Sequence, residues 1–174
     1  MSARRLLVLV LLVAAGAAGA TSSGALDGGD EQAAGDAAGT AETGSVVKVV
    51  DGDTIHVQLG DTREKVRYIG VDTPETKHPT KGVQCFGQKA SEFNASLVAG
   101  ERVRLVRDVE ERDRYGRLLA YVYRVRDGLF VNAELARLGY AQPLSIPPDV
   151  RFADRFAALA REAREQGRGL WSAC

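Results

Sequence analysis

Three consecutive short segments with strand-like patterns constrain the fold more than any other feature of this sequence. Residues 45–50 are rich in β-branched side chains, and residues 54–59 and 65–71 alternate apolar and polar side chains. A period of two places alternate side chains on opposite faces of a strand. Asp51-Gly52 and Gly60-Asp61 lie between the segments and are strong turn signals. The domain is therefore predicted to open with a three-stranded antiparallel meander.

The rest of the chain predicts two more strands and three helices. Ala90, Phe93 and Leu97 recur at helical spacing ahead of Gly100, which is a natural helix stop. The predicted elements are a helix at 88–98, strands at 102–106 and 118–125, a short helix at 132–138, an irregular stretch at 143–148 and a long helix at 149–166. Five strands with a helix between the third and the fourth is the element order of an OB barrel. The predicted fold class is therefore α+β, mainly β: a five-stranded OB-fold barrel with three helices.

The first twenty residues have the pattern of an export signal. Arg4 and Arg5 precede an apolar run at residues 6–13, and Ala18-Gly19-Ala20 offers the small-residue pattern of a cleavage site. The run is too short to span a bilayer as a stable helix. The sequence thus predicts a signal peptide at 1–20 and a secreted protein with no membrane contact after cleavage, with an uncleaved membrane anchor as the alternative.

Residues 21–44 are interpreted as a disordered acidic linker, and residues 45–174 as the folded domain. The linker consists mainly of Ala, Gly, Ser, Thr and acidic residues, and it cannot bury enough apolar surface to offset the entropy of ordering. The whole chain carries 23 basic and 23 acidic residues, whereas the domain carries 21 and 18. This mild excess of positive charge does not by itself indicate a nucleic-acid binder.

The chain has two cysteines, Cys85 and Cys174. An exported protein meets an oxidising compartment, where an even number of cysteines favours a disulfide. A Cys85–Cys174 bridge is predicted, and two thiols remain the alternative.

Two carboxylates are expected to meet at one rim of the sheet. Asp53 precedes the second strand and Asp72 ends the third, and antiparallel pairing brings the start of one strand beside the end of the next. Two negative charges at such a short distance repel each other unless a positive charge lies between them. A hard divalent cation held by Asp53, Asp72 and the backbone carbonyl of Thr73 would satisfy this requirement.

Arginines and a glutamate near the same rim suggest phosphate chemistry. Arg67 lies five residues before Asp72, so strict alternation would place the two on opposite faces, and a twist or bulge near Gly70 is needed to bring them together. Two guanidiniums, Arg67 and Arg117, suit a phosphate because each can donate two hydrogen bonds at once. In this hypothesis Glu75 orients or deprotonates a water, the arginines stabilise the transition state, and the cation acts as Lewis acid.

Three motifs resemble the thermonuclease, or staphylococcal-nuclease-like, family, and the similarity runs from about residue 47 to residue 171. They are Asp51-Gly52-Asp53-Thr54, the run 71–79 that contains Asp72-Thr73-Pro74-Glu75, and the run 113–121 that begins Asp113-Arg114-Tyr115-Gly116-Arg117. The resemblance implies an OB fold and calcium-dependent hydrolysis of DNA and RNA to 3′-phosphate products. It also implies that Asp53, Asp72 and Thr73 are calcium ligands, and that Arg67, Glu75 and Arg117 are catalytic.

The sequence departs from this family in one loop. Well-known members place two tyrosines after the second helix, where they contact the nucleotide, whereas this chain has Ser145-Ile146-Pro147. Tyr115, with the neighbouring Arg114, remains as a predicted contact to the substrate. Because stacking contributes about 1–3 kcal/mol per base, weaker binding or an altered sequence preference is expected.

Two other classes of function compete with a nuclease. An OB barrel can bind nucleic acid or protein without cutting it, and a domain at the end of a linker can serve as a surface adhesin. Neither class requires Arg67, Glu75 and Arg117 together, so the nuclease is favoured. The predicted partners are DNA and RNA as substrates, with no stable protein partner and a monomeric state.

Overall fold

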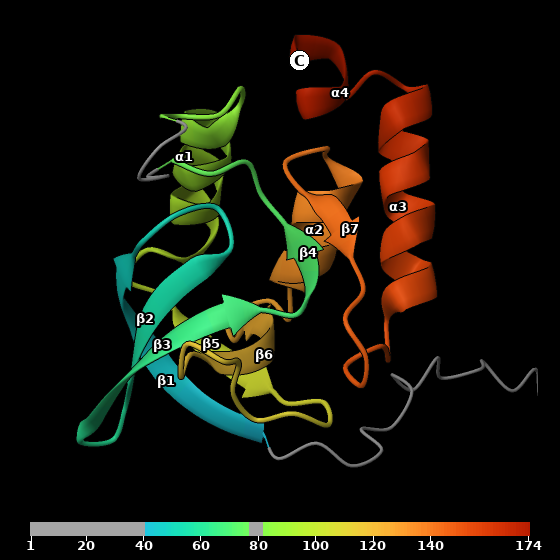
Figure 1. Cartoon of the computed structure of the whole chain (residues 1–174). Coiled ribbons are helices and arrows are strands. Elements are labelled where there is room, and N and C mark those ends of the chain that lie inside the picture. Colours follow the sequence, from blue (N-terminus) through green and yellow to red (C-terminus); the bar gives the residue numbers. More distant parts are fainter. Residues whose placement is uncertain (1–40, 77–81) are drawn as a thin grey trace, which may run out of the picture. The chain divides into compact units, whose positions relative to one another are not determined.

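The computed structural model describes residues 41–76 and 82–174, and their centre is a closed five-stranded barrel. The strands follow one another around the barrel in the order β1-β2-β3-β6-β5 (Figure 1). Their bounds are β1 Ala41–Val49, β2 Thr54–Leu59, β3 Thr62–Tyr68, β5 Arg102–Val106 and β6 Leu118–Arg124. β1 closes the barrel because it pairs with both β2 and β5, and a register shift between Val46 and Lys48 lets it bend between them.

Besides the barrel, the described residues form four helices and a small second sheet. β4 (Gly70–Asp72) pairs with β7 (Gln142–Leu144), and the longest helix, α3 (Ala153–Glu165), runs beside α2 (Val131–Arg137) and β7 (Figure 1). Helix α1 (Gly87–Val98) connects the meander to β5, and α4 (Leu170–Ala173) ends the chain. No helix in the described part of the chain is long and apolar enough to cross a membrane.

The core is continuous from the barrel interior to the helices. Ile55, Val66 and Leu118 are buried inside the barrel, and Phe156 of α3 belongs to the same apolar cluster. One hydrophobic core therefore supports both the barrel and the β4–β7 sheet, so the rim residues attached to these strands have a rigid base.

The predicted fold class is confirmed, and the boundaries of several elements need correction. The predicted linker at 21–44 is wrong for its last four residues, since Ala41 to Gly44 belong to β1 and pair with Val106 to Val103 of β5. Residues 143–148 are not wholly irregular, because Pro143 and Leu144 lie in β7. Helix α3 begins at Ala153 rather than at 149, and α4 is a fourth helix that the pattern did not indicate. The predicted signal peptide and residues 21–40 lie outside the described residues.

The third predicted strand is broken in two, and the break has a clear cause. Residues 65–71 form the end of β3 and most of β4, and the interruption is at Ile69, just before Gly70, whose φ is +80°. A β-carbon at Gly70 would be in direct contact with the ring of Phe156. Only glycine suits both the backbone conformation and the close approach of α3.

The structure contains the predicted Cys85–Cys174 disulfide, which joins the segment just before α1 to the last residue of the chain. Its two Cα atoms lie 6.0 Å apart, within the normal range for such bridges.

Candidate active site

The guanidinium of Arg67 lies between the carboxylates of Asp53 and Asp72. Arg67 Nε is 3.2 Å from Asp53 Oδ1, and Arg67 Nη2 donates to Asp72 Oδ1 at 2.7 Å. The paired strands explain this meeting, because Arg67 is opposite Thr54 in the β2–β3 ladder and Asp53 immediately precedes Thr54. The structure thus brings both predicted carboxylates to one rim, with an arginine between them.

The break at Gly70 allows Arg67 to reach Asp72 despite their odd spacing. Arg67 Nη1 donates to the carbonyl oxygens of Tyr68 and Val71, each at 2.7 Å, so the chain between β3 and β4 wraps around the guanidinium. The expectation that regular alternation must fail near Gly70 is therefore confirmed.

Asp53 also holds the residue that follows Asp72. Its Oδ2 accepts hydrogen bonds from the backbone N–H of Thr73 at 2.8 Å and from the Thr73 hydroxyl at 2.9 Å, while Oδ1 accepts one from the Thr54 hydroxyl at 3.0 Å. Gly52 permits this approach, since a β-carbon there would lie 2.6 Å from the Thr73 hydroxyl oxygen. Asp53 is buried, and its interactions tie β2 to the end of β4.

Asp51 is a further acidic residue of this rim, and sequence reasoning placed it only in a turn. Its Oδ1 accepts a hydrogen bond from the Asp53 N–H at 3.1 Å. Burial, followed by the negative charges of Asp53 and Glu75, raises the pKa of Asp51 to about 6. Burial also raises the pKa of Asp72, and the opposing effect of Arg67 does not cancel the combined influence of burial, Asp53 and Glu75.

The carboxyl groups of Asp51, Asp53 and Asp72 lie together at this rim, beside the guanidinium of Arg67. The donors are carboxylate, hydroxyl and carbonyl oxygens, which are the ligands that hard cations such as Ca²⁺ prefer. Within residues 41–76 and 82–174, no three His, Cys, Asp or Glu side chains form a set that could hold a metal. A cation would therefore rest on two carboxylates, a carbonyl and oxygens from water or substrate, and the residues present fit that composition.

Glu75 lies in the segment that leaves this rim. Its charge contributes to the raised pKa values of Asp51 and Asp72, so it is within electrostatic reach of both. Its Oε1 accepts a hydrogen bond from the Thr76 N–H at 3.0 Å, and its backbone pairs with Gln84. The half-buried Glu75 side chain is thus placed beside the acidic rim.

Arg117 comes from the turn before β6 and is held by Asp113. Its Nε donates to Asp113 Oδ2 at 2.6 Å, and its backbone N–H donates to Oδ1 at 3.0 Å. Burial alone would raise the pKa of Asp113, but hydrogen bonds from Arg117 and Tyr115 lower it, so the carboxylate stays charged. Asp113 is a second residue that the sequence did not identify as functional, because its contact with Arg117 depends on the shape of the turn before β6.

Arg67 and Arg117 line the same cavity. Arg67 pairs with Leu119 in the parallel β3–β6 ladder, and Arg117 precedes Leu119 by two residues, on the same side of the sheet. The cavity has a volume of about 430 Å³, and Tyr115, Arg114, Leu144 and Ile146 also line it. Three acidic residues, Glu110, Asp113 and Asp149, line it as well. Arginines beside apolar side chains suit a nucleotide, which presents both a flat base and a phosphate.

Tyr115 and Arg114, the predicted substrate contacts, both line this cavity. Arg114 Nη2 donates to the Tyr115 hydroxyl at 2.6 Å, and the guanidiniums of Arg114 and Arg117 lie 4.8 and 5.4 Å from the centre of the Tyr115 ring. In the loop where tyrosines are absent, Ile146 is 58% exposed. The cavity therefore combines the exposed ring of Tyr115 with aliphatic side chains such as Leu144 and Ile146.

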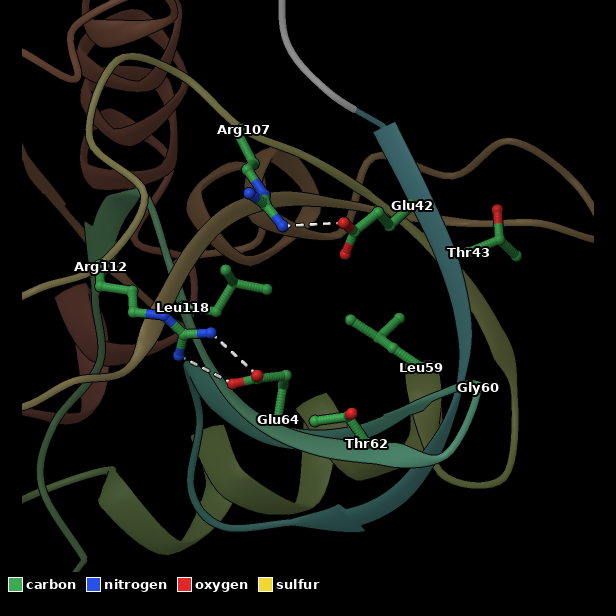
Figure 2. Close-up of a pocket in the computed structure, with 9 residues that line it drawn as sticks. All are labelled: Glu42, Thr43, Leu59, Gly60, Thr62, Glu64, Arg107, Arg112 and Leu118. Carbon is green, nitrogen blue, oxygen red and sulfur yellow. Dashed lines mark hydrogen bonds and ion pairs between the residues drawn. The ribbon is translucent and has the colours of Figure 1, made fainter.

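A second cavity, of about 470 Å³, lies at the opposite end of the β2–β3 hairpin (Figure 2). Its charged residues are already paired: Arg112 makes two hydrogen bonds to Glu64, and Arg107 bonds to Glu42 at 2.9 Å. These pairs leave neither an excess of acid nor an arginine directed to a ligand, so this cavity is not the candidate active site.

Comparison with known proteins identifies this barrel, with its rim of carboxylates and guanidiniums, as a hydrolase of the nuclease type. Residues 65–173 match the family model described as staphylococcal nuclease homologue. The chain is 36% identical to a thermonuclease of Staphylococcus hyicus over 84% of this chain and 85% of that protein. It is 40% identical to a thermonuclease of Staphylococcus intermedius over 72% of this chain and 74% of that protein. It is also 40% identical to the endonuclease YncB of Bacillus subtilis, over 72% of this chain and 59% of that protein. The chain belongs to the staphylococcal nuclease homologue family.

Proposed function

We propose that this chain is a secreted, calcium-dependent endonuclease that hydrolyses DNA and RNA and leaves 3′-phosphate ends. The observation that carries the proposal is the position of Arg67, which contacts Asp53 and Asp72 on one side and lines the cavity of Arg117 and Tyr115 on the other. A phosphodiester in that cavity would lie between the two arginines and next to the acidic rim.

Calcium would be held by Asp53, Asp72 and the carbonyl of Thr73, and when bound it supplies a Lewis acid that offsets the charge of the phosphate. In the structure Arg67 forms ion pairs with both carboxylates and offsets part of their charge. Once positive charge is supplied to Asp53 and Asp72, Arg67 can exchange its carboxylate partners for phosphate oxygens.

The remaining residues divide the chemistry between them. Glu75 orients a water and accepts its proton, because its carboxylate lies beside the rim, close enough for its charge to act on Asp51. Arg117, oriented by Asp113, donates to the oxygens that gain charge in the transition state. Tyr115 and Arg114 contact the base or sugar, in a cavity that Leu144 and Ile146 also line.

The site residues and the export signal imply the biological setting. The small-residue pattern Ala18-Gly19-Ala20 supports cleavage of the signal after residue 20, release of the protein and formation of the Cys85–Cys174 disulfide outside the cell. We propose that the secreted protein acts as a monomer on nucleic acid without a stable protein partner.

The test is cleavage of a supercoiled plasmid and of a single-stranded RNA by the purified protein, in calcium and in excess chelator. We expect cleavage in calcium only, and products whose 5′ ends a polynucleotide kinase can label without prior phosphatase treatment, because 3′-phosphate products carry 5′-hydroxyls. Products that need phosphatase before labelling would refute the proposed cleavage position, and undiminished cleavage in chelator would refute calcium dependence.

Two substitutions separate an enzyme from a binding module. Glu75→Gln removes the base but keeps the side chain's size, and Arg117→Lys keeps the charge but removes the planar guanidinium. Both variants should stay folded and bind an oligonucleotide, while turnover falls by at least about 10²-fold. Wild-type protein that binds DNA in calcium and leaves it intact would instead support the binding module.

A further inference from the structure

The backbone of Glu75 is held from both sides by one residue, Gln84. The Gln84 side-chain Oε1 accepts a hydrogen bond from the Glu75 N–H at 2.8 Å, and the Gln84 N–H donates to the Glu75 carbonyl at 2.9 Å. The position of the Glu75 backbone therefore follows that of Gln84. Gln84 is exposed, and hydrogen bonds in contact with water contribute little unless their partners are already fixed.

The residues that follow Gln84 form a base for the Glu75 segment. Gly87, the first residue of α1, is so close that a β-carbon there would lie 2.8 Å from the Glu75 carbonyl oxygen and 3.0 Å from that of Pro74. Phe86, between Cys85 and Gly87, packs on Tyr140 with the ring centres 5.2 Å apart. The Glu75 segment thus lies directly on residues 84–87.

The Cys85–Cys174 disulfide ties this base to a second anchored element, α4. Cys85 is the neighbour of Gln84 in the chain, and its partner follows α4 directly. Helix α4 is itself held in place, since the Leu170 N–H donates to the Gly139 carbonyl at 2.8 Å and the Arg164 guanidinium lies 4.1 Å from the centre of the Trp171 ring. The bridge therefore connects Gln84 to the helical side of the fold.

The metal-binding rim does not depend on this bridge. Asp53 holds Thr73 directly, and Arg67 holds Asp72, through contacts made within β2, β3 and β4. Between Thr73 and Glu75 only Pro74 intervenes, so the chain passes from a position held by the barrel to one held by Gln84.

We propose that Gln84 is a positioning residue for Glu75 and that the Cys85–Cys174 disulfide keeps Gln84 in place. This inference rests on the proposed role of Glu75 in hydrolysis. Loss of Gln84 or of the disulfide lowers turnover, while calcium affinity and KM stay near their wild-type values, because only the placement of Glu75 changes.

The first experiment compares Gln84→Ala, Gln84→Glu and a matched control, Gln88→Ala. Gln88 is also exposed, lies in the first turn of α1 four residues after Gln84, and bonds to Glu92. We expect kcat of Gln84→Ala to fall by about tenfold, a fraction of the full loss of a general base, with calcium affinity and KM changed by less than about twofold. Gln84→Glu, which keeps the acceptor at the same length, restores most of the activity, and Gln88→Ala is unchanged.

The second experiment removes the bridge, either by Cys85→Ser with Cys174→Ser or by a 1,4-dithiol, to which the two exposed cysteines are accessible. One thiolate of the dithiol attacks a sulfur of the bridge and breaks the S–S bond, and its second thiol then closes the dithiol into a cyclic disulfide. The dithiol thus gives up two electrons and two protons, and both cysteines become thiols. We expect both treatments to lower kcat to a similar extent, reoxidation to restore it, and the dithiol to leave the double serine variant unchanged.

Two further results decide the inference. Adding Gln84→Ala to the double serine variant should lower kcat by no more than about twofold further, because two changes that act through one contact are not additive. Two outcomes would overturn the inference and leave the proposed function standing. In the first, the fold-losses in kcat of Gln84→Ala and of the double serine variant multiply when the changes are combined. In the second, each of these two variants keeps wild-type kcat while Glu75→Gln is inactive.

Amide hydrogen exchange of Glu75 tests the same inference without activity. We expect the exchange rate of this amide to rise by at least about fivefold in Gln84→Ala and to stay unchanged in Gln88→Ala. Equal exchange in all three proteins would overturn the inference, even if the wild-type protein cleaved no nucleic acid.

Discussion

Substitution of Gly70 by alanine tests the geometry that brings Arg67 to Asp72. Gly70 has φ +80°, and an added β-carbon would be in contact with the Phe156 ring. A left-handed conformation costs a residue with a β-carbon about 1–2 kcal/mol. Overpacking against a buried ring adds about 1–3 kcal/mol. We therefore expect Gly70→Ala to lower the free energy of unfolding by about 2–5 kcal/mol.

Gly60→Ala is the matched control, because it isolates the backbone contribution. Gly60 has φ +54°, and nothing lies within 4 Å of its added β-carbon. This variant should lose only the backbone component, about 1–2 kcal/mol. For a domain of this size each kcal/mol lowers Tm by about 3–4 °C, so the expected decreases are about 3–8 °C for Gly60→Ala and about 6–20 °C for Gly70→Ala.

The assay is chemical and thermal unfolding of both variants, followed by calcium titration of the folded proteins. Gly70→Ala should also weaken calcium binding, because the clash moves the strand that carries Asp72, whereas Gly60→Ala should leave it unchanged. Equal destabilisation by the two substitutions would refute the assigned contact with Phe156. Unchanged calcium affinity in Gly70→Ala would refute the claim that Gly70 positions Asp72.

Three further substitutions test individual contacts. Asp53→Asn should weaken calcium binding by at least about tenfold in calorimetric titration. The substitution removes a charged ligand and places an amide N–H₂ beside the N–H and O–H groups that now donate to Asp53. An unchanged affinity would exclude Asp53 as a ligand. Asp113→Asn should lower kcat/KM by about tenfold while calcium affinity is retained, because Arg117 loses its charged partner; wild-type kinetics would show that Arg117 needs no such support. The hydrogen bonds and charge of Arg124 lower the pKa of Asp127 to about 2. The stabilisation from this pair is therefore complete above about pH 4 and is lost as the pH falls towards 2, where Asp127 becomes protonated. Asp127→Asn should therefore be less stable than wild type at pH 6, with the difference shrinking at pH 3, and a difference independent of pH would contradict the assignment.

Much of the fold was predictable because its signals are local. Alternation, turn dipeptides and helical spacing predicted the five barrel strands and three of the helices, with ends displaced by a few residues. The errors are where pairing partners decide. Residues 41–44 have a linker composition, yet they are in β1 because β5 offers them a complete row of backbone partners. Likewise β7 exists because β4 pairs with it.

The residues of the candidate site were likewise only partly predictable from the sequence. The sequence identified two carboxylates and two arginines at strand ends, and antiparallel pairing explains why Asp53 and Asp72 meet. It did not indicate Asp51, whose raised pKa depends on burial and on charges that arrive from other segments. It also missed Gln84, which meets Glu75 only because α1 packs against the end of the rim.

The sequence by itself determined the element types, the chemical groups available to the site and the need for an irregularity near Gly70, since these depend on neighbours along the chain. Only the tertiary structure decided that Arg67 turns between two carboxylates and also faces the cavity of Arg117. The physical reason is that contact between distant segments depends on how the barrel closes and on how α3 packs against Gly70. Those arrangements minimise the free energy of the whole domain, and no single segment encodes them.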